Sequence, residues 1–150
     1  MSVERQYTIR PASEADFPSV RAIIHAVQIN PMGLDWRRFL VAIDPGGKVI
    51  GCGQIKPHRD GSHELASIAV LPAWRHQGVA HEIIEELTAS HPERLFLTCR
   101  EQLGPFYEKL GFTTIGEKEM TPYFQRLQRI VRWLSALHLV DDELLIMRKE

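Results

Sequence analysis

The chain has 150 residues, of which 44% are hydrophobic and 25% charged. This composition is typical of a soluble globular domain with a substantial core. The formal net charge of -1 gives no general attraction to nucleic acid or to an anionic membrane, and neither is an expected partner. No run approaches the ~18 apolar residues of a membrane span, and the N-terminus lacks a signal-peptide pattern. Cys52 and Cys99 form no CxxC pair, so a reducing, cytoplasmic location is expected.

The first third of the chain predicts a strand, a helix and a β-hairpin in that order. Residues 7–10 form a short strand that Pro11 ends. Ser13 is a good helix N-cap, and the apolar positions after it follow helical spacing. Residues 34–38 form either a short helix or a loop. Strands at 39–43 and 49–55 flank a strong turn signal at 44–47.

The rest of the chain alternates between strand and helix patterns. Strands are predicted at 64–71, 95–99, 112–115 and 144–148. Helices are predicted at 79–89 and 103–110, and Gly111 ends the second of them. A further helical pattern covers 122–139. This alternation predicts a single α/β (α+β) domain over residues 1–150.

The turn before the 79–89 helix has the features of a phosphate site. A helix N-terminus presents backbone N–H groups that bind anions. Gly78 allows the backbone to approach a bulky group closely, and Arg75 and His76 add positive charge. The turn lacks the Gly-Lys-Ser/Thr ending of a P-loop, and no dinucleotide G-x-G-x-x-G is present, so these two phosphate-binding classes are disfavoured.

Two motifs in the same order resemble one known family. Residues 75–80 (RHQGVA) are similar to the R/Q-x-x-G-x-G/A motif of the GCN5-related N-acetyltransferases (GNAT family). Residues 105–112 (PFYEKLGF) are similar to that family's fYekLGF segment. The resemblance implies a GNAT-like fold: a mixed, twisted sheet that splays near its middle, with helices on both faces. Here an extra helix would precede the last strand.

The resemblance also implies acetyl-CoA as cosubstrate. A bulge in the strand before the motif would pair with the pantetheine arm. The amides of residues 77–80 would hold the pyrophosphate, with two cationic side chains at the phosphate rim. The cofactor-binding residues predicted in this way are Ile68, Ala69, Val70, Arg75, His76, Gln77, Gly78, Val79 and Ala80. His76 departs from the family pattern, because a glycine is common at this position.

Amine acetylation needs a base, an acid and stabilisation of an oxyanion. The resemblance makes Tyr107 the candidate general acid, directed at the CoA sulfur, and Glu64 the candidate base, directly or through water. The alternatives are a tyrosine that only packs its ring and a carboxylate at a sheet edge beside His63. His58 and His63 are weaker candidates. They lack a clear third ligand, so no metal site is expected.

The acceptor is less defined than the cofactor. Residues 30–38 lie where the family's variable acceptor loop lies. Trp36 and Arg37 combine an apolar wall with a cation, which favours an acceptor with apolar and anionic parts. The alternative is a helix that packs Trp36 on the sheet. Thr98 replaces a glutamate of the ribosomal-protein N-terminal acetyltransferases, which disfavours that substrate class.

The segment 122–139 is unusual for the family, because a short hairpin normally joins the last two strands. Its predicted apolar face consists of Tyr123, Leu127, Ile130, Val131, Leu134 and Leu137. The alternatives are a helix packed on the core, a lid, a homodimer face or a docking surface for an acidic partner.

The sequence leaves two functions open. The first is an acetyl-CoA-dependent N-acetyltransferase that acts on a small-molecule or protein amine by direct attack in a ternary complex. The second is a non-catalytic acyl-CoA-binding sensor or scaffold module.

Overall fold

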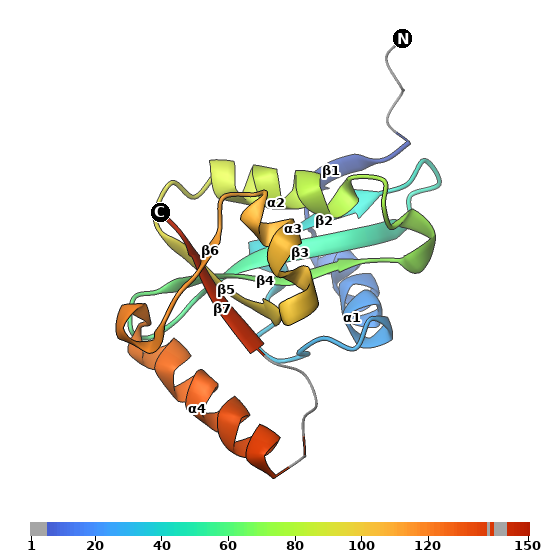
Figure 1. Cartoon of the computed structure of the whole chain (residues 1–150). Coiled ribbons are helices and arrows are strands. Elements are labelled where there is room, and N and C mark those ends of the chain that lie inside the picture. Colours follow the sequence, from blue (N-terminus) through green and yellow to red (C-terminus); the bar gives the residue numbers. More distant parts are fainter. Residues whose placement is uncertain (1–5, 138, 140–143) are drawn as a thin grey trace. The chain divides into compact units, whose positions relative to one another are not determined.

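The computed structural model of the chain describes residues 6–137, 139 and 144–150. Within these residues the chain forms seven strands and four α-helices (Figure 1). In chain order they are β1 (Thr8–Pro11), α1 (Phe17–Ala26), β2 (Phe39–Ile43), β3 (Val49–Pro57), β4 (His63–Val70), α2 (Val79–Ala89), β5 (Leu95–Arg100), α3 (Gly104–Glu108), β6 (Thr113–Thr114), α4 (Pro122–Ala136) and β7 (Leu144–Lys149). The open question at residues 34–38 resolves as a 3-10 turn over Trp36–Arg38. No helix in the described part of the chain combines the length and hydropathy that a membrane span requires.

The strands form one mixed sheet in the order β1-β2-β3-β4-β5-β7-β6. The pairs β1–β2, β2–β3, β5–β7 and β6–β7 are antiparallel. β4 and β5 are parallel, with Glu64 opposite Phe96. A parallel pair needs a long crossover connection, and α2 lies in that connection. The last strand of the chain lies between β5 and β6.

The chain divides into two compact units. Unit 1 consists of Met1–Lys56 and Leu65–Pro92, and unit 2 consists of Pro57–Glu64 and Glu93–Glu150. The chain therefore leaves unit 1 at the end of β3 and re-enters it inside β4. The expectation of one domain over residues 1–150 stays a prediction.

In unit 1, α1 and α2 cover opposite faces of the sheet. Side chains alternate between the two faces of a strand. In β3, Cys52 belongs to a buried cluster with Val20 of α1. Its neighbours Gly51 and Gly53 face α2, and a Cβ atom at Gly53 would lie 2.9 Å from Cγ2 of Ile83. The two glycines thus allow α2 to lie close on the sheet.

In unit 2, α3 and α4 also cover opposite faces. Phe124 of α4 shares a buried cluster with Phe96 of β5 and Ile146 of β7. Leu145 points to the other face, where a Cβ atom at Gly104 of α3 would lie 3.0 Å from its Cδ1. The predicted fold class, a mixed sheet with helices on both faces and an extra helix before the last strand, is confirmed.

The burial of α4 differs from the sequence expectation. The helix ends at Ala136 rather than near residue 139. Phe124 is fully buried, whereas Ile130 and Leu137 are 55% and 51% exposed. The alternative of a helix packed on the core therefore does not hold for Ile130 and Leu137, and the lid, homodimer and docking alternatives stay predictions. The α4 segment has more apolar positions than unit 2 buries, so helical spacing alone could not select the buried side.

Candidate functional site

The predicted site residues fall into the two units. Residues 36–37, 68–70 and 75–80 belong to unit 1, whereas Glu64 and Tyr107 belong to unit 2.

β4 contains a backbone irregularity just before the residues predicted to contact pantetheine. Ser67 has a φ of 59°, a left-handed conformation that is uncommon for a residue other than glycine. Its carbonyl accepts a hydrogen bond from Cys52 Sγ at 3.5 Å. The resemblance places the bulge around residues 68–70. The left-handed residue lies one position earlier.

The turn after β4 leads into α2 through two left-handed residues, His76 and Gly78, with φ of 63° and 82°. α2 begins at Val79, which is fully buried and anchors the helix. Arg75 and Gln77 are exposed, as are His76 and Gly78. The first amides of a helix have no intrahelical partner. The turn therefore presents N–H groups and a cationic side chain to solvent.

The loop before β2 is held in place by side-chain bonds. Lys56 at the end of β3 donates from Nζ to the Met32 carbonyl at 2.8 Å. Asp35 caps the 3-10 turn by accepting from the Arg37 amide at 3.0 Å. The Arg37 guanidinium lies 5.1 Å from the centroid of the Trp36 ring. The two predicted acceptor residues thus lie together on an anchored loop.

Gln54 is a buried polar residue of β3 that the sequence reasoning missed. Its Nε2 donates to Ser67 Oγ at 2.8 Å and lies 3.4 Å from the Gly33 carbonyl. Its Oε1 has no hydrogen-bond partner among the described residues. One side chain thus links the loop before β2 to the irregular part of β4. A glutamine in the middle of the mainly apolar and glycine-rich β3 is a signal that could have identified it.

Glu64, the candidate base, lies near the start of β4 and is 7% exposed. Its Oε1 lies 2.8 Å from Nε2 of His58. An ionised carboxylate only accepts hydrogen bonds, so we infer that His58 Nε2 carries the hydrogen. The alternative of a carboxylate at a sheet edge is wrong, because β4 lies between β3 and β5.

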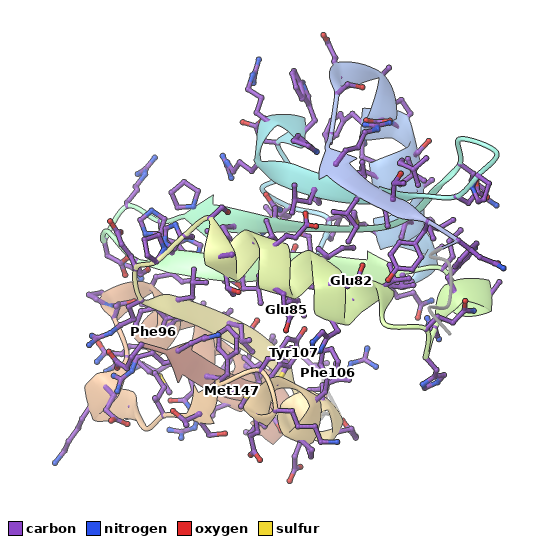
Figure 2. The ribbon with its side chains drawn as sticks, turned by 90° about the horizontal axis from the view of Figure 1, so that it is seen from above. Glu82, Glu85, Phe96, Phe106, Tyr107 and Met147 are labelled. Atoms are coloured by element: carbon purple, nitrogen blue, oxygen red, sulfur yellow. The ribbon has the colours of Figure 1, made fainter. Side chains whose placement is uncertain are left out.

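Tyr107, the candidate acid, lies on α3 and is 8% exposed. Figure 2 shows it beside Phe106 on the same helix. Its ring packs edge-on against Phe106 and Phe112, with centroids 5.1 Å and 6.0 Å away. The hydroxyl makes no hydrogen bond to another residue in the described part of the chain. Burial, followed by the nearby Cys99, raises the pKa of Tyr107 to about 12. The hydroxyl therefore keeps its proton at neutral pH.

Both cysteines are free and buried. In unit 2, Cys99 Sγ lies 3.9 Å from Met147 Sδ, and burial raises the pKa of the Cys99 thiol to about 11. In unit 1, burial raises the pKa of the Cys52 thiol to about 12. Both thiols are thus weak nucleophiles that fill the core.

His58 has a second contact that sequence reasoning missed. Its ring stacks on Tyr123 of α4, with centroids 3.7 Å apart and planes inclined by 18°. Glu64 contacts His58, but Glu64 and Tyr107 make no hydrogen bond with each other in the described part of the chain. Glu64 thus has a polar partner, His58, from the turn before β4. The His58 ring in turn packs against Tyr123 of α4.

A family model described as an acetyltransferase (GNAT) domain matches residues 35–114. This range is more than half of the chain. It includes Trp36 and Arg37, the turn at residues 75–80 and Tyr107. No curated protein sequence matches the chain.

Solved structures with similar folds are numerous. N-acetylglutamate synthase from Neisseria gonorrhoeae, complexed with coenzyme A and N-acetyl-glutamate, superposes with a TM-score of 0.76 at 18% identity, over 99% of this chain and 36% of that chain. Rv2747 from Mycobacterium tuberculosis, in complex with CoA, has a TM-score of 0.72 at 22% identity and covers 95% and 98% of the two chains. A GNAT-family acetyltransferase from Staphylococcus aureus has a TM-score of 0.70 at 12% identity, over 95% and 98%. The chain spans about a third of the Neisseria protein. At these identities the likeness shows the fold alone.

Proposed function

The chain belongs to the GNAT acetyltransferase family, and from that premise we propose that it transfers the acetyl group of acetyl-CoA to a primary amine. The observation that carries the proposal is the environment of the Tyr107 side chain. The Tyr107 residue is buried, its hydroxyl makes no hydrogen bond to another described residue, and its pKa is raised to about 12. It occupies the tyrosine position of the second family motif and is therefore a proton donor available to a bound ligand.

We propose that the turn at residues 75–80 holds the pyrophosphate of acetyl-CoA. The support is local: two left-handed residues and the start of α2 expose amides that an anion accepts. The backbone of residues 68–70 would pair with the pantetheine arm, and the irregular backbone at Ser67 supports a break in regular pairing there. The neighbours that were solved with CoA also support this cosubstrate.

The proposed reaction is direct attack in a ternary complex. The amine nitrogen attacks the thioester carbonyl carbon and forms the C–N bond. Glu64 takes the amine proton, directly or through one water. The C–S bond then breaks, and the departing CoA thiolate receives the Tyr107 proton. The products are an amide and free CoA. The proton on Glu64 is then lost to solvent and the Tyr107 phenolate takes a proton from solvent, so atoms and charges balance and both side chains return to their starting states.

We propose a small acceptor with apolar and anionic parts rather than a bulk protein surface. Trp36 provides an apolar wall, and the Arg37 guanidinium beside it provides the cation. The Neisseria protein was solved with N-acetyl-glutamate, an acetylated amine that carries carboxylates, and this supports the same chemical class. Two free cysteines support a cytoplasmic location.

The test is an incubation of the purified chain with acetyl-CoA and a panel of amines that includes the amino acids. Free thiol and the mass of the acetylated product are measured together. We expect one thiol released for each amide formed, with at least one carboxylate-bearing amine. Tight CoA binding without turnover on any amine would instead support the non-catalytic acyl-CoA-binding module.

A further inference from the structure

The turn between β3 and β4 places His58 against Glu64. The His58 amide donates to the Ser62 carbonyl at 2.9 Å, and the Gly61 amide donates to the His58 carbonyl at 3.0 Å. Gly61 has a φ of +88°, which glycine adopts at little cost. The closed turn puts the two side chains on one side of unit 2, where their exposed fractions are 13% for His58 and 9% for Glu64. The pair is therefore largely shielded from solvent.

Aromatic side chains hold the imidazole in this position. Tyr123 stacks on the His58 ring, and Phe124 meets it edge-on with centroids 5.8 Å apart. Phe124 in turn stacks on Phe96 at 5.0 Å, and Phe96 pairs with Glu64 across β5 and β4. The His58 ring thus packs against two aromatic rings of α4, one of which also contacts the strand that pairs with β4 at Glu64. Rotation of the imidazole would disturb this aromatic packing.

Hydrogen bonds from backbone amides to the Asp60 side chain connect the start of α4 to the same turn. The Tyr123 amide donates to Asp60 Oδ2 at 2.9 Å, and the Ser62 amide donates to Asp60 Oδ1 at 2.9 Å. Partial desolvation raises the pKa of Asp60, but these bonds and the one from the Ser62 hydroxyl outweigh it and hold that pKa well below its usual range. Burial, with the negative charges of Glu64 and Asp60, raises the pKa of Tyr123. At neutral pH Asp60 is therefore charged and Tyr123 is neutral.

We propose that His58 is a positioning residue for Glu64 and that Tyr123 and Phe124 of α4 hold His58 in place. The proposal rests on the proposed function, in which Glu64 takes the amine proton. The imidazole donates to Oε1, and Oε2 is the oxygen that would take the amine proton. A base whose orientation is set before substrate binds loses no activity to reorientation. The extra helix of this chain thus contributes to the acid–base site and does not serve only as a cover for the sheet.

The test compares kcat and KM for His58→Ala, His58→Gln and Glu64→Gln. Glutamine provides an N–H donor near the place of Nε2 but cannot act as a base. We expect His58→Ala to lower kcat by about 10- to 100-fold, with KM for acetyl-CoA unchanged, and His58→Gln to recover most of that loss. In the Glu64→Gln background, His58→Ala should change kcat less than twofold, because residues that act through one another are not additive.

His81 and Glu85 on α2 provide a matched control pair. Their Nε2–Oε1 distance is 2.9 Å, but their side chains are 49% and 62% exposed. His81→Ala should leave kcat and KM unchanged. Tyr123→Phe keeps the stacked ring and should retain more of kcat than Tyr123→Leu. The unfolding midpoint and CoA affinity of every variant establish that it is folded.

A readout without turnover separates the two proposals. The ring nitrogen resonances of His58 should show a hydrogen on Nε2 in the wild type, and Glu64→Ala, which removes the acceptor, or Tyr123→Leu should abolish that preference for Nε2. The proposal is overturned if folded His58→Gln is as slow as His58→Ala, if the effects of His58→Ala and Glu64→Gln multiply, or if the tautomer does not respond. Wild-type turnover in Glu64→Gln would overturn the assignment of the base, even with the His58 resonances as expected.

Discussion

The turn at residues 75–80 and the His58–Glu64 pair are built in opposite ways. The turn in unit 1 presents backbone amides, and the side chains of His76 and Gln77 are exposed. The pair in unit 2 consists of two side chains, and aromatic rings from a distant helix surround it. A backbone site depends on φ and ψ, so it tolerates many side chains but few changes of conformation. A side-chain site depends on the chemical groups themselves.

The two regions are also suited to different tasks, cofactor binding and proton transfer. A backbone turn provides fixed partial charges, which suit a pyrophosphate that does not react. A proton transfer needs a group that changes its protonation state, and only a side chain provides that. We therefore expect changes in the turn to alter cofactor affinity and changes in the pair to alter turnover.

The largest expected effect is at Glu64. Glu64→Gln keeps the shape and one hydrogen-bond acceptor but removes the base, so kcat should fall by about 100- to 1,000-fold. The dissociation constant for CoA, measured by calorimetry, should stay within twofold. Glu85→Gln, at an exposed carboxylate of α2, is the control. A kcat for Glu64→Gln within threefold of the wild type would remove Glu64 from the mechanism.

The next largest loss of kcat is expected at Tyr107. Tyr107→Phe keeps the edge-on ring packing and removes only the hydroxyl, so we expect kcat to fall by about 10- to 100-fold with CoA binding retained. The pKa of Tyr107 is raised to about 12, and the acid form is the one present below that pKa. Ionisation of Tyr107 should therefore cause no loss of wild-type activity up to about pH 10.

Tyr7→Phe is the matched control, because Tyr7 is also a buried tyrosine but lies at the start of unit 1. It should leave kcat unchanged. Equal turnover of Tyr107→Phe and the wild type, with a confirmed amine, would favour the interpretation that Tyr107 only packs its ring.

Sequence predicted the local structure of the first region better than that of the second, for a physical reason. The strand end, the glycine turn and the helix start of residues 68–80 are consecutive, so local patterns contain the whole turn. In the second region, Asp60 and Tyr123 are 63 positions apart, and their contact arises from the packing of unit 2. Glu64 came from a family resemblance, and His58 was ranked low because no local pattern indicates its partners.

The same distinction applies to the fold. Helical periodicity predicted α4, but the rotation that buries Phe124 and exposes Ile130 depends on which apolar face meets β5 and β7. The position of β7 between β5 and β6 is likewise set by long-range pairing. A left-handed residue such as Ser67 has no reliable sequence signal, because serine rarely adopts that conformation.

A smaller effect is expected at Gly78, where the backbone basis of the turn can be tested directly. Its φ is +82° and a Cβ atom would have nothing within 4 Å, so Gly78→Ala introduces strain without a clash. We expect a stability loss of about 1 kcal/mol and, because the amides shift, a CoA dissociation constant about 10-fold higher. Gly47→Ala has the same strain and the same open space at φ +87°. It should lose similar stability with unchanged CoA affinity, and equal CoA affinities in both variants would contradict a backbone-built site.

The smallest effect is at Asp60, which ties the turn before β4 to α4. The Asp60 carboxylate is exposed to solvent, so Asp60→Asn should cost only about 1 kcal/mol of stability at pH 7. The pKa of folded Asp60 lies below the unfolded value of about 3.9. Its contribution is therefore present above about pH 4 and is lost as pH falls through the folded pKa. Urea unfolding from pH 7 to pH 2 should show the wild type and Asp60→Asn converging below about pH 4. A difference in unfolding free energy between the two proteins that stays constant from pH 7 to pH 2 would show that the Asp60 charge does not stabilise α4. The His58–Glu64 pair would then depend on aromatic packing alone.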